Sequence, residues 1–439
     1  MRAIAALAAM TLLVVGCQGG NGARPAVPSD PPSMVPRTAP SPPATASSSS
    51  TPLTHQRTRV DGKRGLAGPA QRTLNARLIR AAWNNNVARA RRLIAAGANV
   101  NAKDETEQSA YLISTSEGYL RLLNLTLRHG ANVHSKDSFN GTGLIRAAER
   151  GHADIVARLL RTDIQVDHVN ELGWTALHEA IILGTGNPRY VDTVRLLVAA
   201  GADVELPSRR DGVRPLQHAR SKGFEQIAAT LRKADCAKRL DRQEATARLL
   251  DAARRGNPDM AVVALRAGAQ LEARDHDRRT PLLLAAIHDR VDVARLLVHL
   301  GADPDALDYR HDSAWLVTGV TGSVRMAETL LPAHPDLALT NRYGGTSLIP
   351  ASERGHVHYV RRVVNTGIDV NHVNNLGWTA LLEAVILGDG SRPYQRIVRI
   401  LLDAGADPTI ADSEGVTPLQ HAQSRRHSEI ARILRRAIS

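Results

Sequence analysis

The sequence repeats itself over most of its length, and this repetition constrains the fold more than any other feature. The pentapeptide GWTAL occupies residues 173–177 and again 377–381, an offset of 204 residues. The pentapeptide PLQHA occupies residues 215–219 and 418–422, an offset of 203 residues. We infer a tandem duplication of a unit of about 200 residues, in which one copy has gained or lost a residue before PLQHA.

Within each unit runs a shorter period of about 33 residues. Its clearest copy begins with Thr280 and Pro281, which are typical of a helix N-cap and of the first helical position. Leu282 and Ala285 lie on one face of the predicted helix, and a second apolar helix follows. Gly301 is expected to end that helix with a positive φ. One such unit cannot bury its apolar face alone, so neighbouring units must stack.

The short period resembles the ankyrin repeat, whose consensus runs T-P-L-H-x-A-A-x-x-G-H and continues with V-x-x-L-L and G-A-x-x-N. The resemblance covers nearly all of residues 74–439, as about 11 copies. It implies an all-α ankyrin-repeat solenoid of helix pairs joined by β-hairpin fingers. We expect one array at residues 73–234 and a second at 246–439, with a charged helical connector at 235–245. The sequence leaves open whether the stack runs straight through this connector or bends there.

The N-terminus resembles the export signal of a bacterial lipoprotein. After Met1 and Arg2, residues 3–15 form an apolar run that is too short to span a bilayer. Val-Val-Gly precedes Cys17 as in a lipobox, which implies removal of residues 1–16 and acylation of Cys17. Gln18 follows where an aspartate would signal retention in the inner membrane. The resemblance implies an envelope protein, on the periplasmic side of a Gram-negative outer membrane or on the outer face of a Gram-positive membrane. The alternative is an ordinary signal peptide with an incidental cysteine.

Residues 17–72 are expected to form a disordered tether between this lipid and the arrays. They are rich in proline, serine, alanine and glycine, and such segments cannot bury enough apolar surface to fold. The chain has 2 cysteines, so a lipid on Cys17 leaves Cys236 without an intrachain partner. We expect Cys236 to be a half-buried structural residue, with a reactive thiol as the alternative.

The sequence offers no catalytic constellation. No second histidine follows His178-Glu179 at the spacing of a zinc-binding helix, and C-x-x-C motifs, phosphate loops and nucleophile elbows are missing. His152 and His356 match the Gly-His step of the ankyrin repeat, where the family resemblance implies a structural role. We therefore predict no catalytic residue, no metal and no cofactor.

By the same resemblance, partners would contact the fingertips and the exposed face of the first helices. The residue before the capping threonine faces this groove, and here it is Trp174 or Trp378. Aromatic side chains dominate binding hot spots, and they make up 3% of this chain. Each tryptophan either contacts a partner or packs on its neighbouring finger. The other residues predicted to line this surface are Glu171, His178, Glu179, Asn374 and Asn375.

Both halves also carry a five-residue insertion between paired helices, after Gly184 and after Gly388. The insertion is either a structural loop copied by the duplication or a binding loop. In the second case its contact residues would be Arg189, Tyr190, Arg392 and Tyr394. Tyr111 and Trp315, by contrast, replace a core leucine and are expected to be buried.

The formal net charge of +13 indicates either a solubilised surface or attraction to anionic partners, such as lipid head groups, envelope phosphates or an acidic protein. Nucleic acid is not expected, because no basic stretch is interleaved with aromatic residues. We predict a monomeric, non-catalytic scaffold that binds another protein and touches the membrane only through its lipid. The alternatives are an accessory subunit or protector of a periplasmic enzyme, or a secreted or surface effector that binds a host or rival-cell protein.

Overall fold

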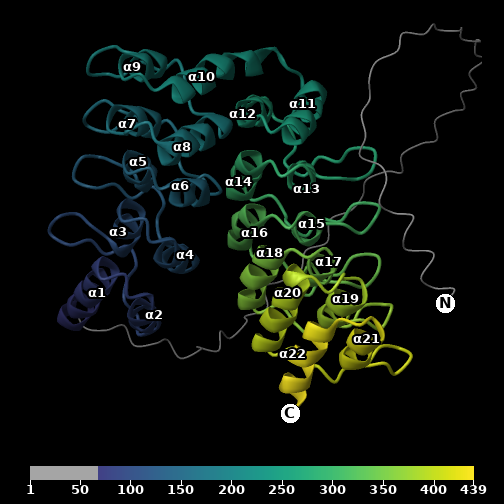
Figure 1. The fold of residues 1–439 in the computed structure, drawn as a ribbon. Coiled ribbons are helices and arrows are strands. Elements are labelled where there is room, and N and C mark those ends of the chain that lie inside the picture. The colour runs from purple at the N-terminus through teal and green to yellow at the C-terminus, as the bar shows by residue number, and fades with distance from the viewer. Residues whose placement is uncertain (1–67) are drawn as a thin grey trace, which may run out of the picture. The chain divides into compact units, whose positions relative to one another are not determined.

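The computed structural model describes residues 68–439; Cys17 and the expected signal peptide lie outside this range. The described part contains 22 α-helices, arranged as 11 consecutive pairs. We call helices α1–α10 array 1 and helices α11–α22 array 2 (Figure 1). The prediction of an all-α stack of helix pairs is confirmed.

In each pair the first helix is followed, after a short turn, by an antiparallel second helix. In array 1 the first helices are α1 (Gly68–Trp83), α3 (Ala110–Ser116), α5 (Gly143–Glu149), α7 (Ala176–Ile182) and α9 (Pro215–Ser221). The second helices are α2 (Val87–Ala95), α4 (Leu120–Arg128), α6 (Ala153–Leu159), α8 (Pro188–Ala199) and α10 (Glu225–Ala234).

Array 2 has six pairs of the same kind. Its first helices are α11 (Arg242–Arg255), α13 (Pro281–Ile287), α15 (Ala314–Thr321), α17 (Leu348–Glu353), α19 (Ala380–Ile386) and α21 (Pro418–Ser424). The second helices are α12 (Pro258–Arg266), α14 (Val291–Leu300), α16 (Val324–Leu330), α18 (Val357–Val363), α20 (Arg392–Asp403) and α22 (Ser428–Ile438). Short 3₁₀ helices are η3 (Asp235–Arg239), η4 (Leu331–Ala333) and η5 (Val364–Thr366).

The local signals in the sequence act as predicted. The Thr280 hydroxyl accepts a hydrogen bond from the Leu283 amide at 3.1 Å, which caps α13. Gly301 ends α14 at a φ of 96°, in the left-handed region that favours glycine. Helix α13 therefore begins, and α14 ends, for reasons that are local to their own repeat.

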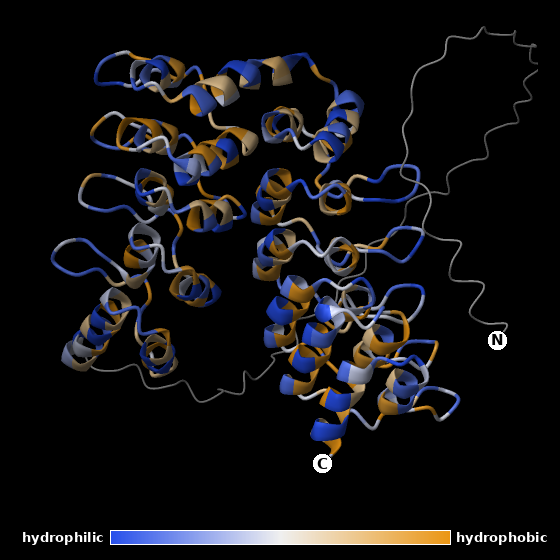
Figure 2. Ribbon diagram, in the orientation of Figure 1, coloured by the Kyte–Doolittle hydropathy of each residue, from blue (hydrophilic) through white to orange (hydrophobic). Residues whose placement is uncertain are grey.

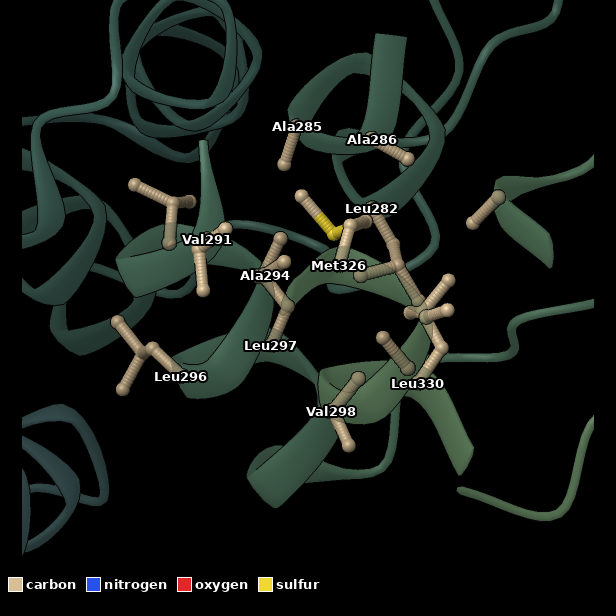
Figure 3. Packing of buried hydrophobic residues seen from close by; sticks show 14 of the residues in the cluster. Leu282, Ala285, Ala286, Val291, Ala294, Leu296, Leu297, Val298, Met326 and Leu330 are labelled. Carbon is tan, nitrogen blue, oxygen red and sulfur yellow. The ribbon is translucent and has the colours of Figure 1, made fainter. Parts of the chain in front are cut away.

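The core is a continuous layer of apolar side chains between the helices (Figure 2). Leu282, Leu297 and Met326 are fully buried where α13, α14 and α16 meet, whereas Leu296 points to the other side of α14 (Figure 3). Tyr111 and Trp315 are 0% exposed, so the prediction that they belong to the core is confirmed.

The stack does not run straight: array 2 turns back beside array 1. Helix α12 packs on α8 and α10, and α14 packs on α6 and α8, so the second helices of the two arrays contact each other (Figure 1). The fingers of the two arrays project away from this contact on opposite sides. The question that the sequence left open is settled in favour of a bend, which lies at η3.

An ion cluster around Asp259 joins the arrays at this contact. The Asp259 carboxylate lies 3.0 Å from Arg195 Nη2 and 3.1 Å from Lys233 Nζ, and it accepts a hydrogen bond from the Thr230 hydroxyl at 2.9 Å. Burial alone would raise the pKa of Asp259, but the two cations and the hydrogen bonds hold it below its usual value. The carboxylate is therefore charged at neutral pH and has partners on two helices of array 1.

Further polar contacts extend the junction along α14. Arg295 Nε lies 2.9 Å from Asp192 Oδ2, and His299 Nε2 lies 2.8 Å from Asp154 Oδ1. The Arg161 guanidinium donates to the His299 carbonyl at 2.6 Å. Each of these contacts joins residues that are far apart in the sequence, so together they fix how the two arrays lie against each other.

Two expectations about boundaries need correction. Helix α1 begins at Gly68, because Leu78, Ala81 and Ala82 are buried against the next repeat and extend the helical register. Residues 68–72 are therefore helical, although the sequence placed them in the tether.

Within the part that the structure describes, no helix is both long and apolar enough to cross a membrane.

The expectation that Cys236 is half-buried is wrong. This residue lies in η3, and its side chain is exposed. Array 2 begins immediately after η3, since Asp241 caps α11 by accepting a hydrogen bond from the Glu244 amide at 2.8 Å. The connector between the arrays is the short 3₁₀ helix η3, and α11 follows it directly.

Candidate binding surface at the finger edge

The fingers of array 1 are tight turns held by the side chain at their base. Asp137 Oδ1 accepts hydrogen bonds from the amides of Phe139 and Gly141, both at 2.9 Å. Successive fingers are also joined through the backbone, because the Glu171 amide donates to the Phe139 carbonyl at 3.0 Å. The Arg209 amide donates to the Gly173 carbonyl at 3.0 Å in the same way. The three fingertips therefore form one connected edge.

A hollow of about 580 Å³ lies on this edge. We call it the finger hollow; it is lined by Asn140, Val169, Asn170, Glu171, Leu172, Gly173, Arg209 and Arg210. Gly173 is required at its base, because it has a φ of 81° and a Cβ there would lie 2.9 Å from the Cβ of Arg209. The close approach of two fingers thus shapes the hollow.

Apolar and charged groups alternate around the finger hollow. Phe139 is 52% exposed and Leu172 is 36% exposed, and the matching Tyr343 and Leu376 of array 2 are 43% and 41% exposed. The Arg146 guanidinium lies 5.5 Å from the Phe139 ring centroid and steadies the ring. Exposed Glu171 faces the same hollow as Arg209. Exposed aromatic and aliphatic anchors next to charges of both signs suit a protein partner better than a small apolar ligand.

Some of the residues near the tips were anticipated by the sequence. Glu171 was predicted at a binding surface and lines the finger hollow. Asn375, at the matching fingertip of array 2, is exposed, and its amide donates to the Tyr343 carbonyl at 3.0 Å. Trp174 and Trp378 are half-buried, and Trp174 Nε1 is a buried donor without a partner within residues 68–439. Trp174 lies at the base of its finger and does not line the hollow.

The prediction that Glu179 and Asn374 line an open surface is wrong. Glu179 is 1% exposed and Asn374 is 7% exposed. Asn170 Nδ2 donates to Glu179 Oε1 at 2.8 Å, and Asn374 Nδ2 donates to Glu383 Oε1 at 2.9 Å in array 2. The amide oxygens of the two asparagines accept from the next tryptophan amides at 3.0 Å. Both Asn–Glu pairs therefore hold a finger from inside.

These buried carboxyls have strongly raised pKa values. Burial, and to a smaller extent the neighbouring Glu149, raises the pKa of Glu179 to about 7. Burial and Glu353 raise the pKa of Glu383 to about 8. At neutral pH the Glu383 carboxyl is mostly protonated, and the Glu179 carboxyl is about half protonated. Through their hydrogen bonds with Asn170 and Asn374, the two carboxyls anchor the fingers.

The prediction that His178 lines an open surface is also wrong, because its side chain is only 1% exposed. Its Nδ1 accepts a hydrogen bond from the Thr175 amide at 3.3 Å, and its own amide donates to the Thr175 hydroxyl, which makes a capping box for α7. Burial and the neighbouring His218 lower the pKa of His178 to about 4. It is a neutral structural residue.

The tyrosines of the five-residue insertion stabilise the stack, as expected if the insertion is a structural loop. The Tyr190 hydroxyl donates to the Glu149 carbonyl at 3.0 Å, and Tyr394 donates to the Glu353 carbonyl at 2.9 Å. Both carbonyls belong to the last residue of the preceding first helix, so each tyrosine caps a helix end. Tyr190 is 6% exposed, which leaves little of it for a partner, whereas Tyr394 is half-buried.

Arginines at the start of the same helices remain on the surface. Arg189 is exposed and donates to the Arg150 carbonyl at 3.2 Å, and Arg392 is exposed at the start of α20. In regular repeats the Gly-His histidine does the work of the tyrosines, since His152 Nε2 lies 3.0 Å from the Ser116 carbonyl. In the repeats with the insertion, a tyrosine thus makes the interrepeat hydrogen bond that the Gly-His histidine makes elsewhere.

Sequence reasoning missed Leu172, Arg209 and Arg210 of the finger hollow, and Phe139 beside it. One signal was available. The offset between the halves falls from 204 to 203 between Ser208 and Val213, so array 1 has one more residue in this fingertip than array 2. The additional residue stands beside Arg209 and Arg210, where array 2 has Ser413 and Glu414.

Three neighbouring residues in array 2 lie close enough together to bind a metal ion. Asp275, His276 and Asp277 offer ligand atoms that lie within 4.8 Å of one another. However, Asp275 already pairs with Arg254 at 2.8 Å, and Asp277 pairs with Arg279 at 2.6 Å. The carboxylates are neutralised by arginines, so the geometry is that of a finger base.

Comparisons with known proteins agree with this architecture. A family model described as Ankyrin repeats (3 copies) matches residues 110–208, 216–308 and 316–412, which is more than half of the chain. The chain is 36% identical over 184 residues to the putative ankyrin repeat protein YahD of Escherichia coli (strain K12), a match that covers 42% of this chain and 92% of YahD. It is 39% identical to human mitochondrial disaggregase over 66 residues, which covers 15% of this chain and 9% of the disaggregase. A crystal structure of an ankyrin repeat domain from Acinetobacter baumannii is 46% identical, covers 43% of this chain and 96% of that domain, and superposes with a TM-score of 0.41.

Proposed function

The chain belongs to the ankyrin-repeat family, and on that premise we propose that it binds another protein at the finger hollow of array 1. Ankyrin repeats are typically protein-binding scaffolds and generally non-catalytic, and no catalytic domain is identified in this chain. The observation that carries the proposal is the exposure of Phe139 and Leu172 beside Glu171 and Arg209. A folded chain keeps such side chains in water at a cost in free energy, which a partner would recover.

The fold supports a binding role because it supplies a rigid edge. The Asn–Glu pairs fix the fingers from inside, and backbone hydrogen bonds join neighbouring fingertips. Little conformational entropy is then lost when a partner docks. Array 2 packs on the second helices α6, α8 and α10 of array 1, and the fingers project away from this contact (Figure 1).

The duplication provides a matched control for the test. A photocrosslinking amino acid at Leu172 should capture one protein in intact cells, and the same amino acid at Leu376 marks the corresponding fingertip of array 2. We expect capture from position 172 and at least about tenfold less from position 376. Phe139→Ala and Arg209→Glu should abolish the crosslink from 172 without changing the thermal melting transition. Equal capture from the two positions, or capture that survives both substitutions, would contradict the proposal.

We also propose that the scaffold is held at a bacterial envelope by a lipid on Cys17. The support is the sequence alone: the apolar run at residues 3–15 and the Val-Val-Gly step before Cys17. Incorporation of a labelled fatty acid into the protein, and its loss in Cys17→Ser, tests this anchor. Label that persists in Cys17→Ser, or none in the parent protein, would contradict it. Release of the unacylated chain into the medium would instead favour a secreted effector.

A further inference from the structure

The second helices at the free end of array 1 carry arginines that have no acidic partner. Helix α2 has Arg89, Arg91 and Arg92, and α4 has Arg121 and Arg128; all five are exposed. Neither helix contains an aspartate or a glutamate. Within residues 68–439 none of the five forms an ion pair, in contrast to the cluster around Asp259.

Array 2 presents exposed arginines on the corresponding side. Arg325 of α16, Arg361 of α18 and Arg396 of α20 are exposed and form no ion pair in the described part of the chain. Some neighbours are compensated: Arg362 pairs with Glu328 at 3.0 Å, and Arg399 pairs with Glu429 at 2.7 Å. Uncompensated cations therefore remain on three successive repeats.

Both sets lie on second helices, the layer through which the two arrays contact each other. Helices α6 and α8 contact α12 and α14, and α2 and α4 continue the same side of array 1 away from that contact (Figure 1). Helices α16, α18 and α20 continue it in array 2. Two hollows of about 430 and 340 Å³ lie where the arrays meet, and both are lined by Asp154, Arg295 and His299. We call the exposed arginines of α2, α4, α16, α18 and α20 the arginine faces.

The charge of the arginine faces restricts what covers them. Like charges on adjacent helices repel, and they create a positive potential that draws in an anion. The chain's own N-terminal segment does not fit, because residues 1–67 contain the acids Asp30 and Asp61 against a larger number of basic residues. A second copy would bring the same positive faces. Nucleic acid fits poorly, since α2 and α4 contain no aromatic residue on which bases could stack.

We propose that the arginine faces bind an extended acidic segment of a polypeptide, at a surface separate from the finger hollow. Guanidinium groups bind carboxylates through two parallel hydrogen bonds, and helical spacing presents them at regular intervals along the face. The inference goes beyond the proposed function, because it concerns the opposite side of each array.

The test uses a labelled oligoglutamate as the probe and fluorescence anisotropy of the whole protein as the measurement. The test variant carries Arg89→Gln, Arg121→Gln, Arg361→Gln and Arg396→Gln. The control variant removes the same charge from exposed arginines on the first helices and fingers: Arg220→Gln, Arg278→Gln, Arg310→Gln and Arg425→Gln. We expect affinity to fall about tenfold in the test variant and less than about twofold in the control, and to fall with added salt.

Other outcomes would overturn the proposal. Equal losses in the two variants would mean that only net charge matters. Tighter binding of duplex DNA or of anionic vesicles, with the same sensitivity to the test variant, would assign the arginine faces to those partners instead. Circular dichroism and melting check that both variants fold. If the quadruple variant does not, Arg121→Glu and its control Arg220→Glu give the same comparison, with an expected loss of about threefold against none.

Discussion

Helices α8 and α20 descend from the same segment, yet one is buried between the arrays and the other is on the surface. Val191 and Asp192 of α8 correspond to Gln395 and Arg396 of α20. Val191 is 2% exposed and Asp192 pairs with Arg295 of array 2, whereas Arg396 is exposed and unpaired within residues 68–439. The two copies kept the residues that build the stack and differ in those that join one array to the other.

The comparison also explains Pro350, which stands where array 1 has Arg146. In array 1 Arg146 forms ion pairs with Asp137 and with Glu149, the latter at 2.9 Å. In array 2 the residue that matches Asp137 is Asn341, so the acid and the base are both replaced. Asn341 Oδ1 still accepts from the Tyr343 amide at 2.9 Å, which keeps the finger turn. A charged finger base and a neutral one therefore support the same fold.

The largest effect should follow from exchanging one residue between α8 and α20. In Asp192→Arg the new cation would stand against Arg295 in a half-buried place, and we expect unfolding free energy to fall by about 3 kcal/mol. The reciprocal Arg396→Asp, on an exposed face, should change it by less than about 0.5 kcal/mol. Urea unfolding measures both. Similar losses in the two variants would mean that α8 and α20 do not differ as described.

The buried carboxyls should make stability depend on pH. The pKa of Glu383 is raised from 4.5 to about 8 in the folded protein, so the folded state holds a proton that the unfolded state releases. Its contribution is fully present below pH 4.5 and is lost as pH rises through about 8. In this window stability should fall by at most about 1.4 kcal/mol per pH unit. Glu383→Gln should remove that slope, which unfolding curves at several pH values would show.

Glu179 sharpens this prediction, because burial raises its pKa only to about 7, with Asn170 and Arg146 lowering it. The slope removed by Glu179→Gln should therefore end about one pH unit lower than that removed by Glu383→Gln. Identical windows for the two variants would contradict the assigned role of the charged finger base in array 1.

The smallest effect is expected at the two insertion tyrosines, which make the same contact in both arrays. Tyr190→Phe and Tyr394→Phe each remove a hydroxyl that donates to a helix-end carbonyl, so each should cost about 1 kcal/mol. Equal costs in urea unfolding would show that the insertion supports the stack in both arrays. A normal unfolding free energy with loss of partner capture would restore the binding-loop interpretation.

The sequence predicted the repeats because their signals are local. Thr280, Pro281 and Gly301 act within one helix pair, and the stack follows from the apolar faces that such pairs must share. The burial of His178 was also within reach, since Leu382 stands at the matching position of array 2. A leucine and a histidine that exchange freely at one position indicate an interior site where histidine is neutral.

The fold-back and the finger hollow could not be predicted in the same way. The array contact depends on pairs such as Asp192 with Arg295, which lie far apart in sequence and carry no periodic signal. The finger hollow depends on three fingertips that meet only after the repeats have stacked. The additional residue near Arg209 marks the place, but its meaning appears only with the neighbouring fingers in position.

A double-mutant cycle between Asp192 and Arg295 tests the central claim, that array 2 turns back onto the second helices of array 1. Charge reversal at each position separately, and then at both together, gives the coupling from urea unfolding of the whole chain. We predict that Asp192→Arg combined with Arg295→Asp is more stable than the sum of the single changes by at least about 1 kcal/mol. Additivity within about 0.3 kcal/mol would contradict the contact.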